Sequence, residues 1–351
     1  MKNIAIIGKF CTDKGIVDGQ AIKTTILASE LERLETCIIK RINTFGWKKR
    51  PFKLFMEAVA QTNVCDDVIL MTDAGGIKVF PWLLLFANIR KKSRLHYAVV
   101  GGWLVHLLKK HPFLVFCLKR FDTILVETHV MKTGLEAMGF NNVYIMRNCK
   151  ALQPVLETEL AIKETEPLPL CIFSRIMREK GVEEAVDAVA AANVHFGRTV
   201  FSLDIYGQVD DEQTEWFEKV VAGFPPEIRY CGVVPFDQSV DVLKSYYALL
   251  FPSKFYTEGI PGTIIDAYAA GVPVISSEWE SFSDIIEPEI TGIGYPFAQT
   301  YRLKEILIEV AQAPERMLRM KRSCLIKAQE YLPNNAMKIL REILFSCESN
   351  R

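Results

Sequence analysis

Two acidic residues frame a glycine-rich stretch in the second half of the chain. The stretch EGIPGTIIDAYAAGVPVI starts at Glu258, and a helix is expected over about Pro261–Ala270, with Asp266 about one turn inside it. Proline is favourable in a first helical turn because its missing N–H would have no partner there. The glycines let the backbone approach a ligand closely. The two carboxylates can accept hydrogen bonds from the hydroxyls of a sugar and a ribose, with backbone N–H groups on the phosphates between them.

Cations follow the first strand expected in the same half. The segment SRIMREKG places Arg175 and Lys180 where that strand ends and the next helix starts. An arginine can bind two oxygens of a diphosphate at once, and a lysine adds a point charge. A second candidate for phosphate binding is the loop GKFCTDKGIVDGQAIK near the N-terminus, where Gly15 and Gly19 precede or open a helix. Its glycine spacing is not GxGxxG, so the dinucleotide-binding pattern is absent.

Each of these segments also has a simpler interpretation. Asp266 would be a solvated helix residue, and Glu258 would be a carboxylate that caps the helix. The loops that carry Arg175, Lys180 and the glycines would be ordinary surface segments. The residue types alone leave these alternatives open.

The elements that must position these residues alternate between apolar runs and helical patterns. Strands are expected in the first half at Ile4–Ile7, Thr36–Ile42, Asp67–Met71, His96–Val100, Thr123–Glu127 and Val143–Met146. Strands are expected in the second half at Leu170–Ile176, Phe201–Tyr206, Ile228–Val233, Ala248–Phe251 and Pro273–Ser276. Such alternation predicts an α/β fold with parallel sheets covered by helices on both faces. We expect two doubly wound, Rossmann-like domains that face a central cleft, with ligands at the carboxyl ends of the strands.

The length of the chain supports two domains. Single cores rarely grow beyond roughly 250–300 residues, and this chain has 351. The segment Ala151–Pro169, rich in Glu, Thr and Pro, is expected to be a linker. We expect one domain over residues 1–160 and a second over 161–332, with a C-terminal helix at about 333–351 that packs back on the first.

Charge is divided unevenly between the two halves. Residues 1–165 carry 24 Lys and Arg against 15 Asp and Glu, a formal net charge of +9, and the remainder carries −9. A basic half can attract nucleic acid, phosphate groups or an anionic membrane. Basic and aromatic residues are mixed in the segments 47–55, 90–94 and 107–120. We interpret these segments as a membrane-binding surface, although aromatic core residues with solvated cations would give the same pattern. No nucleic-acid-binding motif is present.

Other features point to the cytoplasm. The nine cysteines are dispersed, without metal-ligand spacing, which is typical of a reduced protein. The N-terminal residues MKNIAIIGKF lack a signal-peptide cleavage site, and the longest apolar run, Val79–Ile89, is too short to span a bilayer. We expect a cytoplasmic protein, peripheral at the inner face of the membrane.

Several motifs, taken in order, resemble one enzyme family. The segments SRIMREKG, LDIYGQ, YCGVVP, LLFPSKFYTEGIPGTIIDAYAAGVPVISS and TGIGYP follow each other as in the retaining glycosyltransferases of family 4, which have the GT-B fold. The similarity is strong over roughly Leu170–Phe297 and weaker before it. The ordered set is specific, whereas each piece alone is a weak indicator.

The resemblance implies roles for individual residues. Glu258 would contact hydroxyls of the donor sugar, and Asp266, where the family usually has glutamate, would hold the ribose. Arg175 and Lys180 would bind the donor diphosphate. Further donor-binding positions implied are Gly15 and Gly19 in the N-terminal loop, Tyr206, Gly207, Val233 and Val234 around the base, and Gly259, Ile260, Gly262 and Thr263 at the sugar and phosphates. Ser174 stands where the family has glycine. The histidine that many members carry after the fourth strand has no safe counterpart in His96 or His106.

The implied activity is retaining transfer of a hexose from a nucleotide-diphosphate sugar, with a UDP-sugar favoured. The acceptor would be a saccharide, lipid-linked, in surface polysaccharide biosynthesis. The first domain would bind this acceptor and the second the nucleotide sugar. Because no Asp-x-Asp motif is present and Arg175, Lys180 and helix N–H groups can neutralise the leaving diphosphate, we expect no metal and no cofactor besides the nucleotide-sugar co-substrate.

Two other functions stay open. A nucleotide-sugar 2-epimerase of the same fold would need cleft histidines and carboxylates, and the chain has only five histidines. A non-catalytic, membrane-recruiting partner of another transferase would have no need for Glu258, Arg175 and Lys180.

Overall fold

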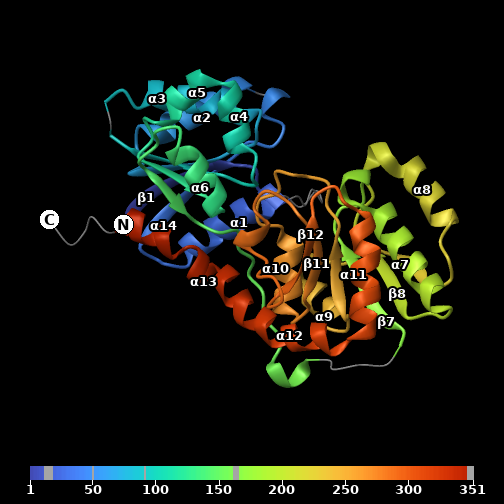
Figure 1. Ribbon diagram of the computed structural model, residues 1–351. Helices are drawn as coiled ribbons and strands as arrows, with labels where there is room; N and C mark the ends of the chain where they lie inside the picture. The colour runs from blue at the N-terminus through green and yellow to red at the C-terminus, as the bar shows by residue number, and fades with distance from the viewer. Residues whose placement is uncertain (12–18, 50, 91, 161–165, 346–351) are drawn as a thin grey trace. The chain divides into compact units, whose positions relative to one another are not determined.

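The computed structural model describes residues 1–11, 19–49, 51–90, 92–160 and 166–345. The chain forms two compact units. Unit 1 comprises Met1–Ala151 and Tyr331–Arg351, and unit 2 comprises Leu152–Glu330. The units therefore divide after Ala151 and after Glu330, where we expected boundaries after 160 and 332. Each unit contains one six-stranded parallel sheet (Figure 1).

The sheet of unit 1 has the order β2-β1-β3-β4-β5-β6. Its strands are β1 (Lys2–Gly8), β2 (Cys37–Asn43), β3 (Asp67–Met71), β4 (Arg94–Ala98), β5 (Thr123–Val126) and β6 (Val143–Ile145). The inner strands are runs of Ile, Val and Leu with both faces buried, as a parallel sheet between two helical layers requires. The order reverses at β1, because the chain runs from β1 to β2 on one side and then returns to β3 on the other.

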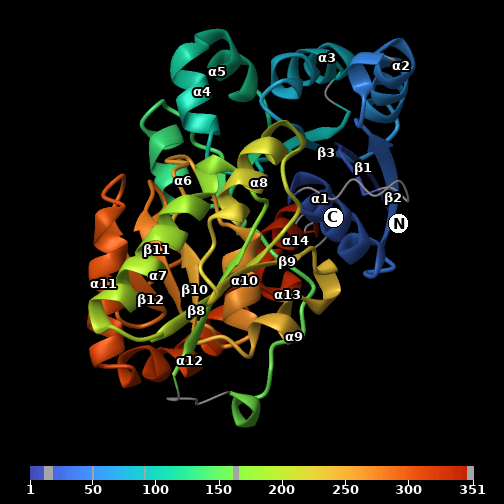
Figure 2. The ribbon, with the colours of Figure 1, turned by 90° about the vertical axis from the view of Figure 1, so that its right-hand side faces the viewer.

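Helices cover both faces of this sheet (Figures 1 and 2). One face packs against α2 (Pro51–Thr62), α3 (Phe80–Ala87), α4 (Leu104–Lys110), α5 (Pro112–Leu118) and α6 (His129–Glu136). The other face packs against α1 (Gly19–Glu32), α13 (Pro333–Ala336) and α14 (Lys338–Phe345). Short 3-10 turns are η1 (Trp47–Lys49) and η2 (Gly76–Lys78). The helical pattern of Gly102–Arg120 forms two helices because Pro112 starts a new one.

The sheet of unit 2 has the order β12-β11-β10-β7-β8-β9. Its strands are β7 (Leu168–Phe173), β8 (Phe201–Tyr206), β9 (Ile228–Gly232), β10 (Ala248–Phe251), β11 (Val274–Glu278) and β12 (Gly292–Pro296). We did not expect β12, because Gly292 and Gly294 lower the strand preference of its sequence. Gly292 is needed there, since an added Cβ would lie 2.3 Å from the carbonyl oxygen of Val274.

The helices of unit 2 complete a second doubly wound domain. They are α7 (Val182–Phe196), α8 (Thr214–Ala222), α9 (Ser239–Leu243), α10 (Gly262–Ala269), α11 (Tyr301–Gln312) and α12 (Glu315–Ala328). The 3-10 turns are η3 (Glu157–Glu159), η4 (Arg178–Lys180), η5 (Asp211–Gln213), η6 (Phe236–Gln238), η7 (Phe282–Asp284) and η8 (Gln329–Tyr331). α7 packs against α11, and α10 packs against α9 and α12. Among the described residues, no helix has the length and apolar character needed to cross a bilayer.

The strand orders predict where each unit binds a ligand. In doubly wound sheets, ligands bind at the carboxyl ends of the strands, where the strand order reverses. In unit 1 that point lies between β1 and β3, and in unit 2 it lies between β7 and β10. The loops that follow β7 and β10 contain Arg175, Lys180 and Glu258, the candidates singled out from the sequence.

Candidate active site

The loop after β7 is held tightly against the loop after β10. Gly181 has a φ of +75°, in the left-handed region, and an added Cβ would lie 2.1 Å from the carbonyl oxygen of Pro252. Only glycine permits this approach. The N–H of Lys254 also donates to the carbonyl of Glu179 at 2.8 Å. The two loops that meet where the strand order reverses are thus fixed to each other by backbone contacts.

Lys180 and Glu258 form an ion pair across these loops. The Nζ of Lys180 bonds to Oε1 of Glu258, and Ser253 Oγ donates to the same oxygen at 3.1 Å. The two charged side chains are 17% and 16% exposed, so the pair is shielded but open to a ligand. The ammonium group lies 5.4 Å from the centre of the Phe251 ring and 5.1 Å from that of Phe255. The aromatic faces stabilise the cation in this position.

The start of α10 lies directly after Glu258. The N-cap residue is Pro261, and no side chain caps the helix. Glu258 is therefore not the cap carboxylate of the simpler interpretation. The Oγ1 atom of Thr263, in the first turn, is buried without a hydrogen-bond partner among the described residues. Uncapped N–H groups carry the positive end of the helix dipole, so this end of α10 suits an anion.

Asp266 is buried inside α10. Its side chain belongs to a residue that is 2% exposed, and the neighbouring residues Ile264, Ile265 and Ala267 are equally enclosed. The interpretation of Asp266 as a solvated helix residue is therefore wrong. Burying a carboxylate is costly unless it has partners, which indicates a specific role for this acid. Gly259 and Ile260, on the other side of the helix start, are also buried, whereas Gly262 is partly exposed.

Arg175 lies apart from the Lys180–Glu258 pair. Its guanidinium binds Asp210, after β8, with an Nη2 to Oδ2 distance of 2.8 Å, and its side chain is 61% exposed. Asp210 is itself held by a backbone bond from its N–H to the carbonyl of Ile176 at 3.0 Å. The structure thus brings Lys180 and Glu258 together and places Arg175 at the rim of the same group of loops.

The predicted base region lies at the ends of β8 and β9. Gly207 has a φ of +140°, and an added Cβ would lie 1.7 Å from the carbonyl oxygen of Ser174. The Tyr206 hydroxyl lies 2.7 Å from that of Tyr246. Beyond β9, Val233 is 65% exposed, and Val234 is half-buried. This edge offers exposed apolar surface beside a backbone that only glycine can form.

A buried network anchors this edge. The Tyr246 hydroxyl donates to Asp204 Oδ2 at 2.6 Å, and Arg229 binds both oxygens of Asp204 at 2.5 and 3.0 Å. Burial would raise the pKa of Asp204, but the hydrogen bonds from Arg229 and Tyr246 hold it below its ordinary value. Burial also raises the pKa of Tyr206. Tyr206 is therefore a neutral, fixed hydrogen-bonding residue.

The N-terminal candidates are less well defined. Gly15 lies outside the described residues. Gly19 is the exposed first residue of α1 in unit 1, and an added Cβ would meet nothing within 4 Å. His96 is buried, and its Nε2 lies 2.8 Å from Oδ1 of Asp67, at the amino end of β3. His106 lies within α4.

Sequence reasoning missed Ser253, Asp210 and Tyr246. Each contacts a predicted site residue, yet each is an ordinary polar residue in its own segment. Ser253 could have been found as the first hydroxyl after a buried strand that leads into the glycine-rich stretch. The contacts of Asp210 and Tyr246 depend on the pairing of β7, β8 and β10, which the sequence does not display. Among the described residues, no cluster of His, Cys, Asp and Glu could hold a metal ion.

One family model matches part of unit 2, and two curated proteins match about half of the chain. The family model "Glycosyl transferases group 1" matches residues 168–312, a region that contains Arg175, Lys180, Glu258 and Asp266. The amylovoran biosynthesis glycosyltransferase AmsK of Erwinia amylovora is 24% identical over 186 residues, 51% of this chain and 45% of AmsK. The lipopolysaccharide 1,6-galactosyltransferase of Salmonella typhimurium is 26% identical over 227 residues, 59% of this chain and 57% of that protein. The chain spans about half the length of these curated relatives.

Solved structures extend the likeness to the whole fold. The crystal structure of Anabaena HepE in complex with UDP-glucose matches 99% of this chain and 100% of HepE, with a TM-score of 0.75 and 12% identity. At that identity the match concerns the fold alone. Two parallel six-stranded sheets, each flanked by helices, match the GT-B fold that the sequence predicted.

Proposed function

We propose that this chain is a retaining glycosyltransferase that moves a hexose from a nucleotide-diphosphate sugar, a UDP-sugar, to a saccharide acceptor. The observation that carries the proposal is the Lys180–Glu258 pair beside the uncapped start of α10, where the strand order of unit 2 reverses. The match of this region to the group 1 family model supports it. UDP is favoured because HepE, which shares the fold, binds UDP-glucose.

In this proposal each residue has a task in the reaction. The bond between C1 of the sugar and the diphosphate oxygen breaks, and negative charge builds on the leaving diphosphate. Lys180, Arg175 and the N–H groups of α10 stabilise that charge, and such fixed electrostatic groups lower the barrier. The acceptor hydroxyl oxygen bonds to C1 on the face from which the diphosphate departs, and its proton passes to the diphosphate. This route needs no protein base.

The two acids would bind different parts of the donor. Glu258 lies beside the glycine turn and would hold hydroxyls of the transferred sugar, while Asp266 would hold the ribose. Both hydrogen bonds that the described residues give to Glu258 fall on Oε1. Because Glu258 also binds Lys180, the same carboxylate would orient both the sugar and the ammonium group that binds the leaving diphosphate. The proposal includes no divalent metal and no cofactor. Lys180, Arg175 and the N–H groups of α10 would neutralise the charge on the diphosphate that a metal would otherwise neutralise.

The acceptor in this proposal is a lipid-linked saccharide, in the assembly of a surface polysaccharide. AmsK acts in amylovoran biosynthesis, and the Salmonella relative is a lipopolysaccharide galactosyltransferase. Such an acceptor places the protein in the cytoplasm, at the inner face of the membrane.

An exposed apolar face on unit 1 supports membrane binding. Each of α2, α3 and α5 buries one side in the core, through residues such as Leu54, Leu84 and Leu114. Each also exposes large apolar residues in its own segment or directly after it: Phe52, Met56, Trp82, Phe86, Ile89, Phe113 and Phe116, from 40% to 82% exposed. α3 contacts both α2 and α5, so the helices that carry these seven residues lie side by side in one layer of the unit (Figure 1). We call the seven residues the apolar face.

The charges around the apolar face suit an anionic membrane. The helices α2 to α5 contain Lys53, Lys109 and Lys110 against one acid, Glu57. Beyond α5, the Arg120 guanidinium lies 3.4 Å from the centre of the Phe116 ring. Exposed apolar patches of this kind mark binding surfaces, and cations beside them add attraction to anionic lipids.

A donor panel tests the proposed activity. Thermal shifts with UDP-, GDP-, ADP- and dTDP-sugars should single out a UDP-sugar, since a ligand at 100 times its dissociation constant adds roughly 2.7 kcal/mol. Lys180→Gln should abolish most of the shift, and Lys304→Gln, on the exposed side of α11, should leave it intact. Transfer should persist in EDTA and give a product of unchanged anomeric configuration.

Other outcomes would select the rival functions. Release of the nucleotide diphosphate without glycosylation of any acceptor would favour the epimerase. Absence of any nucleotide-sugar shift would favour a non-catalytic partner. Transfer lost in EDTA and restored by Mn²⁺ would refute the metal-free mechanism alone.

Vesicle binding tests the apolar face. A buried phenylalanine contributes roughly 1.5–3 kcal/mol, so the double variant Phe86→Ser/Phe113→Ser should lower binding to phosphatidylglycerol vesicles about a hundredfold or more. Val194→Ser, at a position 80% exposed in unit 2, is the matched control. Wild-type binding should weaken with salt. Equal binding of the double variant and the control would contradict the assignment.

A further inference from the structure

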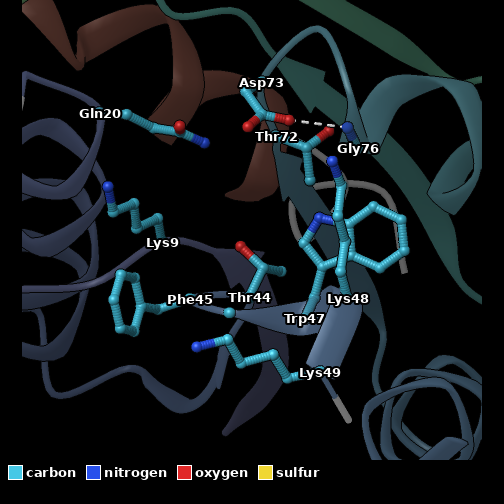
Figure 3. A pocket seen from close by; sticks show the side chains of 11 residues that line it. Lys9, Gln20, Thr44, Phe45, Trp47, Lys48, Lys49, Thr72, Asp73 and Gly76 are labelled. Carbon is cyan, nitrogen blue, oxygen red and sulfur yellow. Dashed lines mark hydrogen bonds between the residues drawn. The ribbon is translucent and has the colours of Figure 1, made fainter. Parts of the chain in front are cut away.

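Unit 1 contains a pocket at the point where its own strand order reverses. The pocket has a volume of about 350 Å³, and residues that directly follow β1, β2 and β3 line it (Figure 3). We call it the β1–β3 pocket. Strand topology predicts a ligand at this place in a doubly wound sheet. Lys180, Arg175, Glu258 and Asp266, to which the proposed function gives tasks, lie in unit 2, and none of them lines this pocket.

A fixed loop shapes one wall of the pocket. Asn43 Oδ1 accepts hydrogen bonds from the N–H groups of Phe45 at 3.0 Å and Phe10 at 3.3 Å, which ties the end of β2 to the segment after β1. Gly46 has a φ of +65°, and its carbonyl accepts from the N–H of Lys49 at 2.9 Å. The turn η1 that follows sets Trp47, Lys48 and Lys49 along the pocket.

The pocket carries an excess of positive charge. Lys9, Lys48 and Lys49 line it, against one acid, Asp73. Asp73 Oδ1 already accepts from the N–H of Gly75 at 3.0 Å. It also accepts from the N–H of Gly76 at 2.7 Å (Figure 3). Within the part of the chain that the structure describes, Lys48 and Lys49 form no ion pair. Two unpaired ammonium groups on a concave surface suit an anionic ligand.

Other lining residues indicate a saccharide beside the anion. The Trp47 ring packs against Phe80, with 5.5 Å between ring centres and an interplanar angle of 70°, and so is held firmly while it lines the pocket. A fixed aromatic ring offers an apolar surface to the C–H groups of a sugar ring. Thr72 also lines the pocket, and its Oγ1 is buried without a partner among the described residues. These features suit a ligand with both polar and apolar sides.

We propose that the β1–β3 pocket binds the acceptor, and that this acceptor is a saccharide bearing a phosphate or carboxylate group. Lys48 and Lys49 bind the anionic oxygens, and Trp47 lies against the sugar ring. This inference rests on the proposed function, which places the donor in unit 2. It also changes the interpretation of the segment 47–55. Lys48 and Lys49 serve this pocket, and the membrane surface is the apolar face on α2, α3 and α5.

Calorimetry with small sugars tests the proposal. The full chain, saturated with UDP, is titrated with glucose 1-phosphate, methyl glucuronide and uncharged methyl glucoside. At least one anionic sugar should bind more tightly than methyl glucoside. Lys48→Gln/Lys49→Gln should weaken that binding about tenfold or more, as expected for charge-assisted hydrogen bonds, and leave methyl glucoside unchanged. Preference for the phosphate or for the glucuronide identifies the anion.

Control variants make the result decisive. Lys53→Gln, an exposed lysine on α2 outside the pocket, should leave all three affinities unchanged. Trp47→Leu should weaken all three sugars alike. Equal affinities for charged and uncharged sugars, or equal losses in Lys53→Gln and the double variant, would overturn the proposal. Failure of UDP to bind, with anionic sugars still bound through Lys48 and Lys49, would refute the donor assignment and leave the anion site standing.

Discussion

At the scale of single residues, the candidate site depends on one carboxylate with several partners. Glu258 binds Lys180 and Ser253 at once, so its charge orients a cation and a hydroxyl before any ligand arrives. Preorganised groups of this kind stabilise developing charge without the cost of reorganisation. Asp266, by contrast, is enclosed within its helix. The two acids therefore differ in what their removal should change.

Kinetic constants should separate these two acids. Contacts that strengthen in the transition state change kcat, whereas contacts that are equal before and during the reaction change KM. Glu258→Gln should lower kcat about 10²–10³-fold, the range for loss of one electrostatic stabiliser. Asp266→Asn should mainly raise the KM for the donor. Glu218→Gln, exposed on α8, is the control. Equal effects of Glu258→Gln and Asp266→Asn on both constants would contradict this division.

The sequence identified part of this site, and the limit has a physical reason. Lys180 and Glu258 were identified because each follows a strand at the same edge of a parallel sheet. Ser253 and Asp210 were not, because a serine or aspartate in a loop gains its role only from the residue it meets. The burial of Asp266 also could not be foreseen, since it depends on the helices that pack around α10.

At the scale of elements, α12 carries a lysine in an apolar setting. Lys321 is 2% exposed, and its Nζ donates to the carbonyl of Tyr246 at 2.8 Å. Burial lowers the pKa of Lys321 from 10.5 to about 8. The charged form therefore costs the folded state about 3 kcal/mol. This cost applies in full below pH 8, where Lys321 is protonated in both the folded and the unfolded chain.

The free energy of unfolding should show the titration of Lys321 as the pH rises. Between pH 8 and 10.5 the unfolded chain binds more protons at this position than the folded chain, so the free energy of unfolding increases with pH. Relative to Lys321→Met, the wild type should gain up to about 3 kcal/mol over this interval. Urea unfolding of both proteins at pH 7.5 and pH 10 measures the difference in the free energy of unfolding. The contributions of the other titratable groups cancel because both proteins contain them. A constant difference would show that Lys321 titrates normally.

Most strands could be predicted because parallel strands are continuous apolar runs. β3, β8 and β10 have the bounds that we expected. β12 could not be predicted, because close packing of Gly292 on β11 replaced the usual branched side chains. The ends of the helices were harder to predict than the strands. Pro112, for example, starts α5 and so separates it from α4.

At the scale of the whole molecule, two units with the same design carry different residues at corresponding places. Where the strand order of unit 2 reverses lie Lys180 and Glu258, an ion pair. In unit 1 the corresponding pocket has Lys48 and Lys49, which form no ion pair with any residue that the structure describes. The opposite net charges of the two halves of the chain pointed to different ligands. The apolar face was predicted in part, because Phe52, Phe113 and Phe116 lie in the segments 47–55 and 107–120 that we interpreted as a membrane surface. The residues of α3 were not, because a helix with apolar residues on two sides has the same composition as a fully buried one.

The return of the chain to unit 1 has a consequence for its biosynthesis. Met337, which lies between α13 and α14, and Leu340 and Leu344 of α14 cover the same sheet face as Leu27 and Leu31 of α1. A ribosome releases these residues only after all of unit 2. Unit 2 is contiguous, so it can complete its fold first, while one face of the earlier sheet waits partly uncovered. Unit 1, whose synthesis begins first, is thus the unit that completes its fold last.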